Sequence, residues 1–299
     1  MGLSLKNLQS QLLSPTALAY LALFSGLFGL GMSAIFVRFA EAPGAVNGFY
    51  RMLTAVVIFA IPLNAQVRRH PITSKRAAWF ALAAGACFAG DLAFWNTAVF
   101  MTSAANATFL ANTAPLWVGL GSVVFFHQRL RPLFWIGLMI SLSGAAILLN
   151  SDFHAGREVI IGSLLSLGAG FFYAGFFLTT EQARNGLNTF VSWWLAALGS
   201  MGCLLVIALA LRQPFFGYPW PTYAWIFCGA LVTQVGGYMF VNFALGHLPA
   251  TIVSSTLLLQ PVVTAIAAIL LLHEPLCLFQ IFGGFFVISG VWIVNRYGR

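Results

Sequence analysis

The sequence predicts an all-α integral membrane protein in which ten transmembrane helices form two five-helix inverted-topology repeats. Of its 299 residues, 60% are hydrophobic and only 7% are charged, too few charges to cover a water-soluble surface. Apolar runs of about 18 or more residues recur along the chain, which is the length that a helix needs to cross ~30 Å of hydrocarbon. In addition, part of the sequence occurs twice, 146 positions apart.

The segment 90–147 carries this repetition. A shift of 146 positions, without a gap, gives 12 identities over these 58 positions. Some identical pairs are of types that a shared excess of Leu and Ala does not explain: Asn96 with Asn242, Pro115 with Pro261, His127 with His273, Gly137 with Gly283 and Gly144 with Gly290. Such a duplication divides the chain into a first repeat, residues 1–151, and a second repeat, residues 152–299.

Ten spans are expected, and the short links between them carry nearly all of the charges. The spans lie at 16–37, 44–64, 77–99, 104–126, 132–150, 159–180, 187–211, 220–245, 250–272 and 276–295. Because each repeat holds five spans, an odd number, the two repeats cross the membrane in opposite directions, an arrangement that is found in many secondary transporters.

The basic residues predict the orientation. If the links alternate between the two sides, ten basic residues fall on one side and three on the other: Lys6, Arg68, Arg69, Lys75, Arg76, Arg129, Arg131, Arg184, Arg296 and Arg299 against Arg38, Arg157 and Arg212. Since Lys and Arg are enriched in cytoplasmic links, we expect a multi-pass protein of the bacterial inner membrane with both termini in the cytoplasm. The net charge of +8 then reflects orientation and not a nucleic-acid partner.

Two charged residues, Arg51 and Asp91, fall well inside predicted spans. A charge in hydrocarbon is costly enough to require a partner, water or a function. At 1.5 Å per residue, both side chains lie about 10–12 Å deep on the same side. They can form a salt bridge that fixes the second and third spans. Alternatively, Arg51 receives the carboxylate of a substrate while Asp91 orients it or receives an ammonium group.

Four uncharged polar residues are further candidates for substrate binding. Asn96 and Asn242, at equivalent repeat positions, need hydrogen-bond partners in an apolar interior, either as interhelical bonds or as a polar floor for the substrate. Asn112 and Gln260 come shortly before Pro115 and Pro261, respectively. Because each proline frees a backbone carbonyl, these two segments are either binding patches or simple helix kinks.

Aromatic residues divide by depth along the spans. Those near span ends fit an interfacial belt: Trp79, Trp135, Trp193, Trp194, Trp220, Trp225, Trp292 and Tyr297. Tyr50, Trp95, Tyr173 and Tyr238 lie deeper and carry polar atoms that hydrocarbon does not satisfy. They are either core residues or, with Arg51, a pocket for a zwitterion with a bulky apolar side chain.

Nothing in the sequence indicates an enzyme, a cofactor or a metal. It has no phosphate-binding glycine loop, no zinc-ligand spacing and no second carboxylate at the depth of Asp91. His127 and His273 are expected at opposite faces of the membrane, where they cannot share a metal. The cysteines, Cys87, Cys203, Cys228 and Cys277, are scattered singly and are expected to be small apolar residues.

Each half resembles one EamA-type unit of the drug/metabolite transporter superfamily. The resemblance rests on Phe49-Tyr50-Arg51, on the helices of Pro115 and Pro261 with the segments 127–130 and 273–276 that follow them, and on the glycine pairs named above. The family commonly has Glu where Gln128 stands, so the first copy departs from the pattern, while Glu274 keeps it. Within the superfamily the chain is most similar to the YddG-type bacterial exporters of aromatic and other amino acids.

The expected function is export of aromatic and other neutral amino acids, by alternating access, through a secondary transporter that acts as a monomer among membrane lipids. The main alternative is a multidrug, lipophilic-cation or other small-metabolite exporter of the same superfamily. A membrane enzyme would need a catalytic cluster near an interface. A channel or structural protein would not need two inverted halves that meet at a central site.

Overall fold

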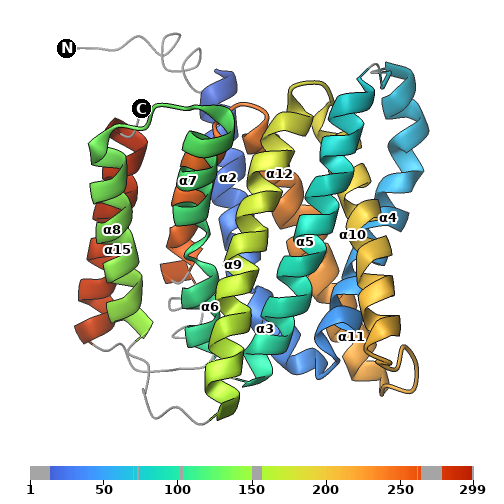
Figure 1. Ribbon diagram of the computed structural model, residues 1–299. Coiled ribbons are helices and arrows are strands. Elements are labelled where there is room, and N and C mark those ends of the chain that lie inside the picture. Colours follow the sequence, from blue (N-terminus) through green and yellow to red (C-terminus); the bar gives the residue numbers. More distant parts are fainter. Residues whose placement is uncertain are drawn as a thin grey trace, which may run out of the picture.

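The computed structural model describes residues 14–69, 71–72, 74–101, 104–149, 157–260, 262–263 and 278–297. Within these ranges all regular structure is helical, and the helices stand side by side in a bundle (Figure 1). The long uninterrupted helices are α4 (Gly44–Arg69), α5 (Lys75–Met101), α8 (Pro132–Leu149), α9 (Arg157–Arg184), α10 (Thr189–Ala210) and α15 (Leu278–Tyr297).

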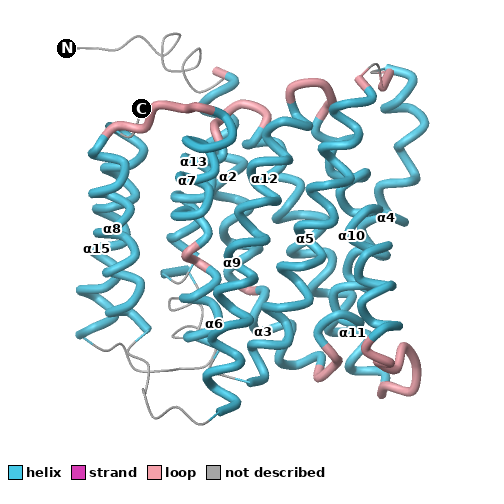
Figure 2. The backbone as a smooth tube through the Cα atoms, viewed as in Figure 1, coloured by secondary structure: helices cyan, strands magenta, loops and turns pink. Residues whose placement is uncertain are grey.

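Other predicted spans are interrupted near their middle, as the tube in Figure 2 shows for the segment between α6 and α7. The first span consists of α2 (Pro15–Gly31) and α3 (Ser33–Ala40), and the fourth of α6 (Ala104–Ala111) and α7 (Ala114–Phe126). The eighth consists of α11 (Trp220–Gly229), the π-helix η1 (Ala230–Gly237) and α12 (Tyr238–Leu245), and α13 (Ala250–Thr256) continues into the 3-10 turn η2 (Leu257–Leu259).

Six helical segments of the described chain are long and apolar enough to cross a membrane: Pro15–Ala40, Gly44–Arg69, Lys75–Met101, Arg157–Arg184, Thr189–Ala210 and Trp220–Leu245. Shorter apolar helices lie at Ala114–Phe126, Pro132–Gly144 and Ala250–Leu259. The prediction of an all-helical, multi-pass membrane protein is therefore confirmed. The count of ten spans stays a prediction, because part of the ninth lies outside the described residues.

Local signals set several helix ends. Ser14 caps α2 by accepting a 3.2 Å hydrogen bond from the backbone N–H of Ala17, and Pro15 follows at the first helical position, where its missing N–H is harmless. Asn188 caps α10 in the same way, by accepting from Val191 N–H at 2.8 Å. At the far end of α4, Arg68 and Arg69 occupy the last turn, where positive charge is favourable for the helix dipole.

Helices α8 and α15 run in opposite directions and pack closely (Figure 1). A Cβ added at Gly137 would lie 2.9 Å from the carbonyl oxygen of Gly290, and one at Gly144 would lie 2.7 Å from that of Gly283. The contacts are therefore reciprocal: Gly137 contacts Gly290, which is the repeat equivalent of Gly144, and Gly144 contacts Gly283, which is the repeat equivalent of Gly137. Only glycine permits such close backbone approach between membrane helices.

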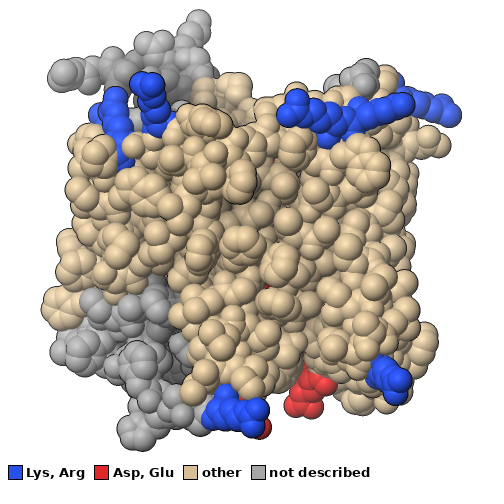
Figure 3. All heavy atoms as spheres, viewed as in Figure 1, with Lys and Arg blue, Asp and Glu red and all other residues tan. Residues whose placement is uncertain are grey.

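Charged side chains gather at the two ends of the bundle and are nearly absent from the face between them (Figure 3). Lys and Arg are concentrated at the end where α4 ends and α5 begins, while the opposite end carries fewer of them. Helix α2 begins and α15 ends at the basic end (Figure 1). Among the described charged residues, Arg51 and Asp91 are the buried ones, at 1% and 6% exposure.

The prediction that Trp193 belongs to an interfacial belt is wrong. Its side chain is fully buried, because it lies on the face of α10 that packs against the centre of the bundle. There it contacts Phe88, Phe176 and Tyr238. Trp79, Trp220 and Trp292 are exposed as a belt requires.

Candidate functional site

A cavity of about 60 Å³ lies between helices of the two halves of the chain. Its walls include most of the residues that the sequence singles out: Arg51, Asp91, Trp95, Asn112, Tyr173, Tyr238 and Gln260. The lining is completed by Leu92 on α5 and by small and apolar residues around the helix interruptions: Leu30, Gly31, Ser33, Ala34, Thr108 and Ala111. One buried water needs ~10–15 Å³, so the cavity has room for a few water molecules.

Arg51 projects from α4 of the first half and is held mainly by the second half. Its Nε donates a 2.9 Å hydrogen bond to Gln234 Oε1, and its Nη2 donates to Thr233 Oγ1 at 2.5 Å and to Ser33 Oγ at 2.9 Å. Its third nitrogen, Nη1, is buried and has no partner among the described residues. The guanidinium of this cavity-lining residue therefore keeps donors that are not used by the described residues.

The two acceptors on the second half belong to the π-helix η1. Such a turn is wider than an α-helical turn, and π-helices are frequent at functional sites. Here it presents the consecutive residues Thr233 and Gln234 to one guanidinium. Thr233 Oγ1 also donates to the carbonyl of Gly229 at 2.6 Å, and the indole Nε1 of Trp193 donates to the backbone carbonyl of Gln234 at 3.0 Å.

Asp91 lies on α5 and lines the same cavity. No oxygen of Asp91 comes within 4.0 Å of a nitrogen of Arg51, so these two residues do not form the direct salt bridge that their similar depth suggested. Both side chains lie in the wall of the same cavity. The depth of a residue gives its position along the span but not the direction of its side chain. It therefore could not show that Arg51 points toward Thr233 and Gln234.

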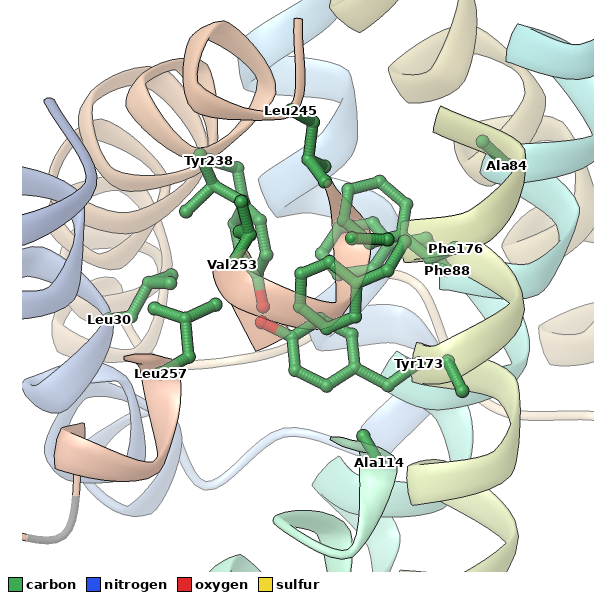
Figure 4. Packing of buried hydrophobic residues seen from close by; sticks show 14 of the residues in the cluster. Leu30, Ala84, Phe88, Ala114, Tyr173, Phe176, Tyr238, Leu245, Val253 and Leu257 are labelled. Carbon is green, nitrogen blue, oxygen red and sulfur yellow. The ribbon is translucent and has the colours of Figure 1, made fainter. Parts of the chain in front are cut away.

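Besides Trp95 on α5, the cavity wall contains two tyrosines, Tyr173 on α9 and Tyr238 on α12. The hydroxyl groups of Tyr173 and Tyr238 point toward each other, with Phe88 and Phe176 packed behind them (Figure 4). The two tyrosine rings are 6.4 Å apart, and the ring of Tyr238 is stacked on that of Trp193 at 5.6 Å. The cavity thus combines one cation, one carboxylate, polar groups and aromatic rings.

Three predicted site residues do not line this cavity. Tyr50 donates a 2.7 Å hydrogen bond to the carbonyl of Phe215, in the link between α10 and α11. Asn96 Nδ2 donates to the carbonyl of Gly44 at 2.9 Å, which is the interhelical bond that was one of its two expected roles. Asn242 is fully buried, and neither polar atom of its side chain has a partner among the described residues.

The predicted kink at Pro115 takes the form of a break. Helix α6 ends at Ala111, and α7 starts at Ala114 with Pro115 in its first turn. Asn112, inside the break, faces the cavity. Pro261 and His273 lie outside the described residues. No group of three His, Cys, Asp or Glu side chains that could hold a metal occurs in the described part of the chain.

The sequence reasoning missed Ser33, Thr233, Gln234 and Trp193. A signal for one of them was present, since Gln234 is an amide deep in an apolar span, four residues before Tyr238. The π-helix that brings Thr233 and Gln234 to one guanidinium has no comparable sequence signal.

The chain matches a known protein family over most of its length. Residues 12–150 and residues 160–296 each match the model of the EamA-like transporter family. The chain belongs to this family. Membership confirms the superfamily that the sequence resembles.

Among curated relatives, the chain is 25% identical over 189 residues to the uncharacterized transporter YvbV of Bacillus subtilis, with 62% of this chain and 61% of that protein covered. It is 27% identical over 209 residues to an uncharacterized transporter of Archaeoglobus fulgidus, with 68% and 71% covered. It is 24% identical over 206 residues to an uncharacterized transporter of Methanothermobacter thermautotrophicus, covering 66% of this chain and 58% of that protein. The match thus spans about three fifths of the length of two of these relatives.

A solved crystal structure has the same fold. The TM-score is 0.75 at 17% sequence identity, and the match covers 94% of this chain and 97% of the other. At this level of identity the likeness of the EamA-type chain to the solved protein concerns the fold alone.

Proposed function

We propose that this EamA-family transporter exports amino acids, aromatic and other neutral ones included, from the cytoplasm across the inner membrane by alternating access. The observation that carries the proposal is the composition of the cavity wall: a guanidinium whose Nη1 has no partner among the described residues, and a carboxylate without an ion pair, lie there beside aromatic rings. An amino acid offers the complementary groups: a carboxylate, an ammonium and a side chain of variable shape.

The role of each group follows from its chemistry. The Nη1 of Arg51 donates charge-assisted hydrogen bonds to the carboxylate of the substrate. Asp91 accepts hydrogen bonds from the ammonium group of the substrate. The side-chain amides of Asn112 and Gln260 form hydrogen bonds with the remaining polar atoms of the substrate. The rings of Tyr173 and Tyr238 contact the side chain. Because Arg51 is already held by three neutral acceptors, it is oriented before the substrate arrives.

The size of the cavity requires movement. About 60 Å³ holds a few waters and no amino acid, so the walls must separate to admit the substrate. The breaks between α2 and α3 and between α6 and α7 border the cavity, and the π-helix ends directly before the lining residue Tyr238. Interrupted helices are places at which such walls can bend.

We further propose that the halves are two five-helix inverted repeats that divide near residue 151, and that the basic end of the bundle faces the cytoplasm. The two separate family matches and the reciprocal glycine contacts between the antiparallel helices α8 and α15 support the repeat. The concentration of Lys and Arg at one end (Figure 3) supports the orientation. We take the monomer as the functional unit.

A lipophilic cation is the main rival substrate, because Asp91 among aromatic rings also suits a cation. Counterflow in proteoliposomes separates the two. We expect vesicles preloaded with phenylalanine to take up labelled phenylalanine, threonine and methionine, and not tetraphenylphosphonium. Uptake of the cation and of no amino acid would overturn the proposed substrate.

A matched pair of variants tests the site. Arg51→Met should abolish amino-acid counterflow, whereas Arg38→Met should leave it unchanged, because Arg38 is exposed at the end of α3. Normal counterflow in a folded Arg51→Met protein would remove Arg51 from the site.

A further inference from the structure

Polar groups without partners continue from the cavity toward the basic end of the bundle. Thr180 and Asn242 are fully buried, and neither the hydroxyl of Thr180 nor the side-chain amide of Asn242 has a hydrogen-bond partner among the described residues. Buried polar groups are almost always hydrogen-bonded. The two side chains are therefore available to bind water or substrate that enters between the helices.

Helix geometry places both groups on a continuation of the cavity wall. Asn242 follows Tyr238 by four residues on α12, and Thr180 follows Tyr173 by seven on α9, spacings that return to the same helix face. At 1.5 Å per residue they lie about 6 Å and 10 Å beyond the tyrosines, respectively. Thr180 also precedes Arg184 by four residues, and the side chain of Arg184 reaches α12. Thr180 and Asn242 therefore lie along the contact between the two helices.

Arg184 closes this line of polar groups at the end of the bundle. Its Nε donates a 3.1 Å hydrogen bond to the backbone carbonyl of Asn242, and its Nη1 donates to the carbonyl of Leu187. The guanidinium also lies directly against Gly246, where an added Cβ would be 2.7 Å from Arg184 Cζ. A single side chain thus ties the end of α9 to the end of α12.

We propose that the entrance by which the substrate reaches the cavity from the cytoplasm runs between α9 and α12, and that Arg184 is the latch that closes it. When Arg184 releases Asn242, water reaches the side chains of Asn242 and Thr180, which gain the partners they lack in the closed state. The freed guanidinium then meets the carboxylate of an entering amino acid. The identity of this substrate rests on the proposed function, whereas the position of the entrance does not.

Accessibility of a single cysteine tests the entrance. In a background in which the four native cysteines are replaced by Ala, Thr180→Cys is treated with a membrane-impermeant thiosulfonate on sealed vesicles of each orientation. We expect slow reaction in the parent and about tenfold faster reaction when Arg184→Gln or Gly246→Ala is added, only from the Arg184 side. Gly246→Ala opens the latch by sterically displacing the guanidinium.

Two controls keep the result specific. Ser166→Cys lies on the same helix about 21 Å from Thr180 and is equally buried, with its native hydroxyl bonded to the carbonyl of Gly162; its rate should not change. Gly202→Ala, at a glycine with open space around it, should not accelerate labelling at Thr180→Cys. Size-exclusion chromatography confirms that each variant is folded.

An unchanged rate at Thr180→Cys in folded Arg184→Gln and Gly246→Ala proteins would overturn the latch. Equal acceleration at Ser166→Cys would overturn it too, because it would indicate general loosening. The labelling needs no substrate, so its outcome is independent of counterflow. Opening of the latch without amino-acid counterflow would leave the entrance standing and refute the proposed substrate.

Discussion

The indole of Trp193 and the π-helix residue Gln234 are joined by a 3.0 Å hydrogen bond from Nε1 to the backbone carbonyl. The side chain of Gln234 accepts in turn from Arg51 Nε. Trp193 therefore supports Arg51 through one intermediate residue. Its neighbour Trp194 makes a similar bond, from Nε1 to the carbonyl of Val56 at 3.2 Å, that does not involve Arg51.

We expect Trp193→Phe to raise the KM of phenylalanine counterflow several-fold, because the carbonyl of Gln234 loses its donor and the side chain that holds Arg51 becomes free to shift. An unmade hydrogen bond of a buried group costs about 1–3 kcal/mol, so thermal stability should fall as well. Trp194→Phe should lower stability with no change in KM. Equal KM values for the two variants would contradict the link to Arg51.

We expect Arg51→Lys to impair phenylalanine counterflow almost as much as complete loss of the side chain. The acceptors Ser33, Thr233 and Gln234 are met by two different guanidinium nitrogens, and a single ammonium cannot reproduce that geometry. We expect at least a tenfold rise in KM for phenylalanine, which corresponds to about 1.4 kcal/mol of binding free energy. Arg38→Lys, at an exposed position, should have no effect. A KM within twofold of wild type for Arg51→Lys would show that only the charge matters.

Much of the fold could be predicted because its signals are local or periodic. Apolar runs and their charged links gave the places of α4, α5, α9 and α10. The charges at 51 and 91 and the tyrosines at 173 and 238 were recognised as deep polar groups, and all four line the cavity. The interruptions near Met32 and in η1 were not foreseen. For η1 the reason is that the apolar pattern does not distinguish the i→i+4 hydrogen bonds of an α-helix from the i→i+5 bonds of a π-helix.

The main errors in the sequence-based predictions concerned the direction in which a side chain points around its helix axis. Position along a span gives depth, and depth alone paired Arg51 with Asp91 and assigned Trp193 to the interface. Which way a side chain turns depends on the neighbouring helices, here η1 and the aromatic cluster of Phe88 and Tyr238. Tyr50 illustrates the same limit, because it lies one residue from Arg51 and yet bonds the link residue Phe215.

Gly144→Ala should destabilise the contact between α8 and α15. The new Cβ would lie 2.6 Å from the backbone nitrogen of Val287 and 2.7 Å from the carbonyl oxygen of Gly283. Because both contacts are with backbone atoms, they can be relieved only if the two helices move apart. Overpacking of this kind typically costs about 1–3 kcal/mol, measurable as a lower melting temperature in detergent. Gly284→Ala, with nothing within 4 Å, is the matched control and should be neutral or slightly stabilising. Equal melting temperatures for the two variants would argue against close packing at Gly144.

The orientation of the bundle can be tested at its two ends in intact bacteria. Arg69 is exposed at the end of α4, on the basic side, and Phe216 is 81% exposed in the link between α10 and α11 on the other side. In a cysteine-free background, we expect Phe216→Cys to react with a membrane-impermeant maleimide in whole cells. Arg69→Cys should react only after the membrane is permeabilised, because excess Lys and Arg hold that end in the cytoplasm. The reverse pattern would place the latch residue Arg184 outside the cell, and the proposed cytoplasmic entrance would then be an external one.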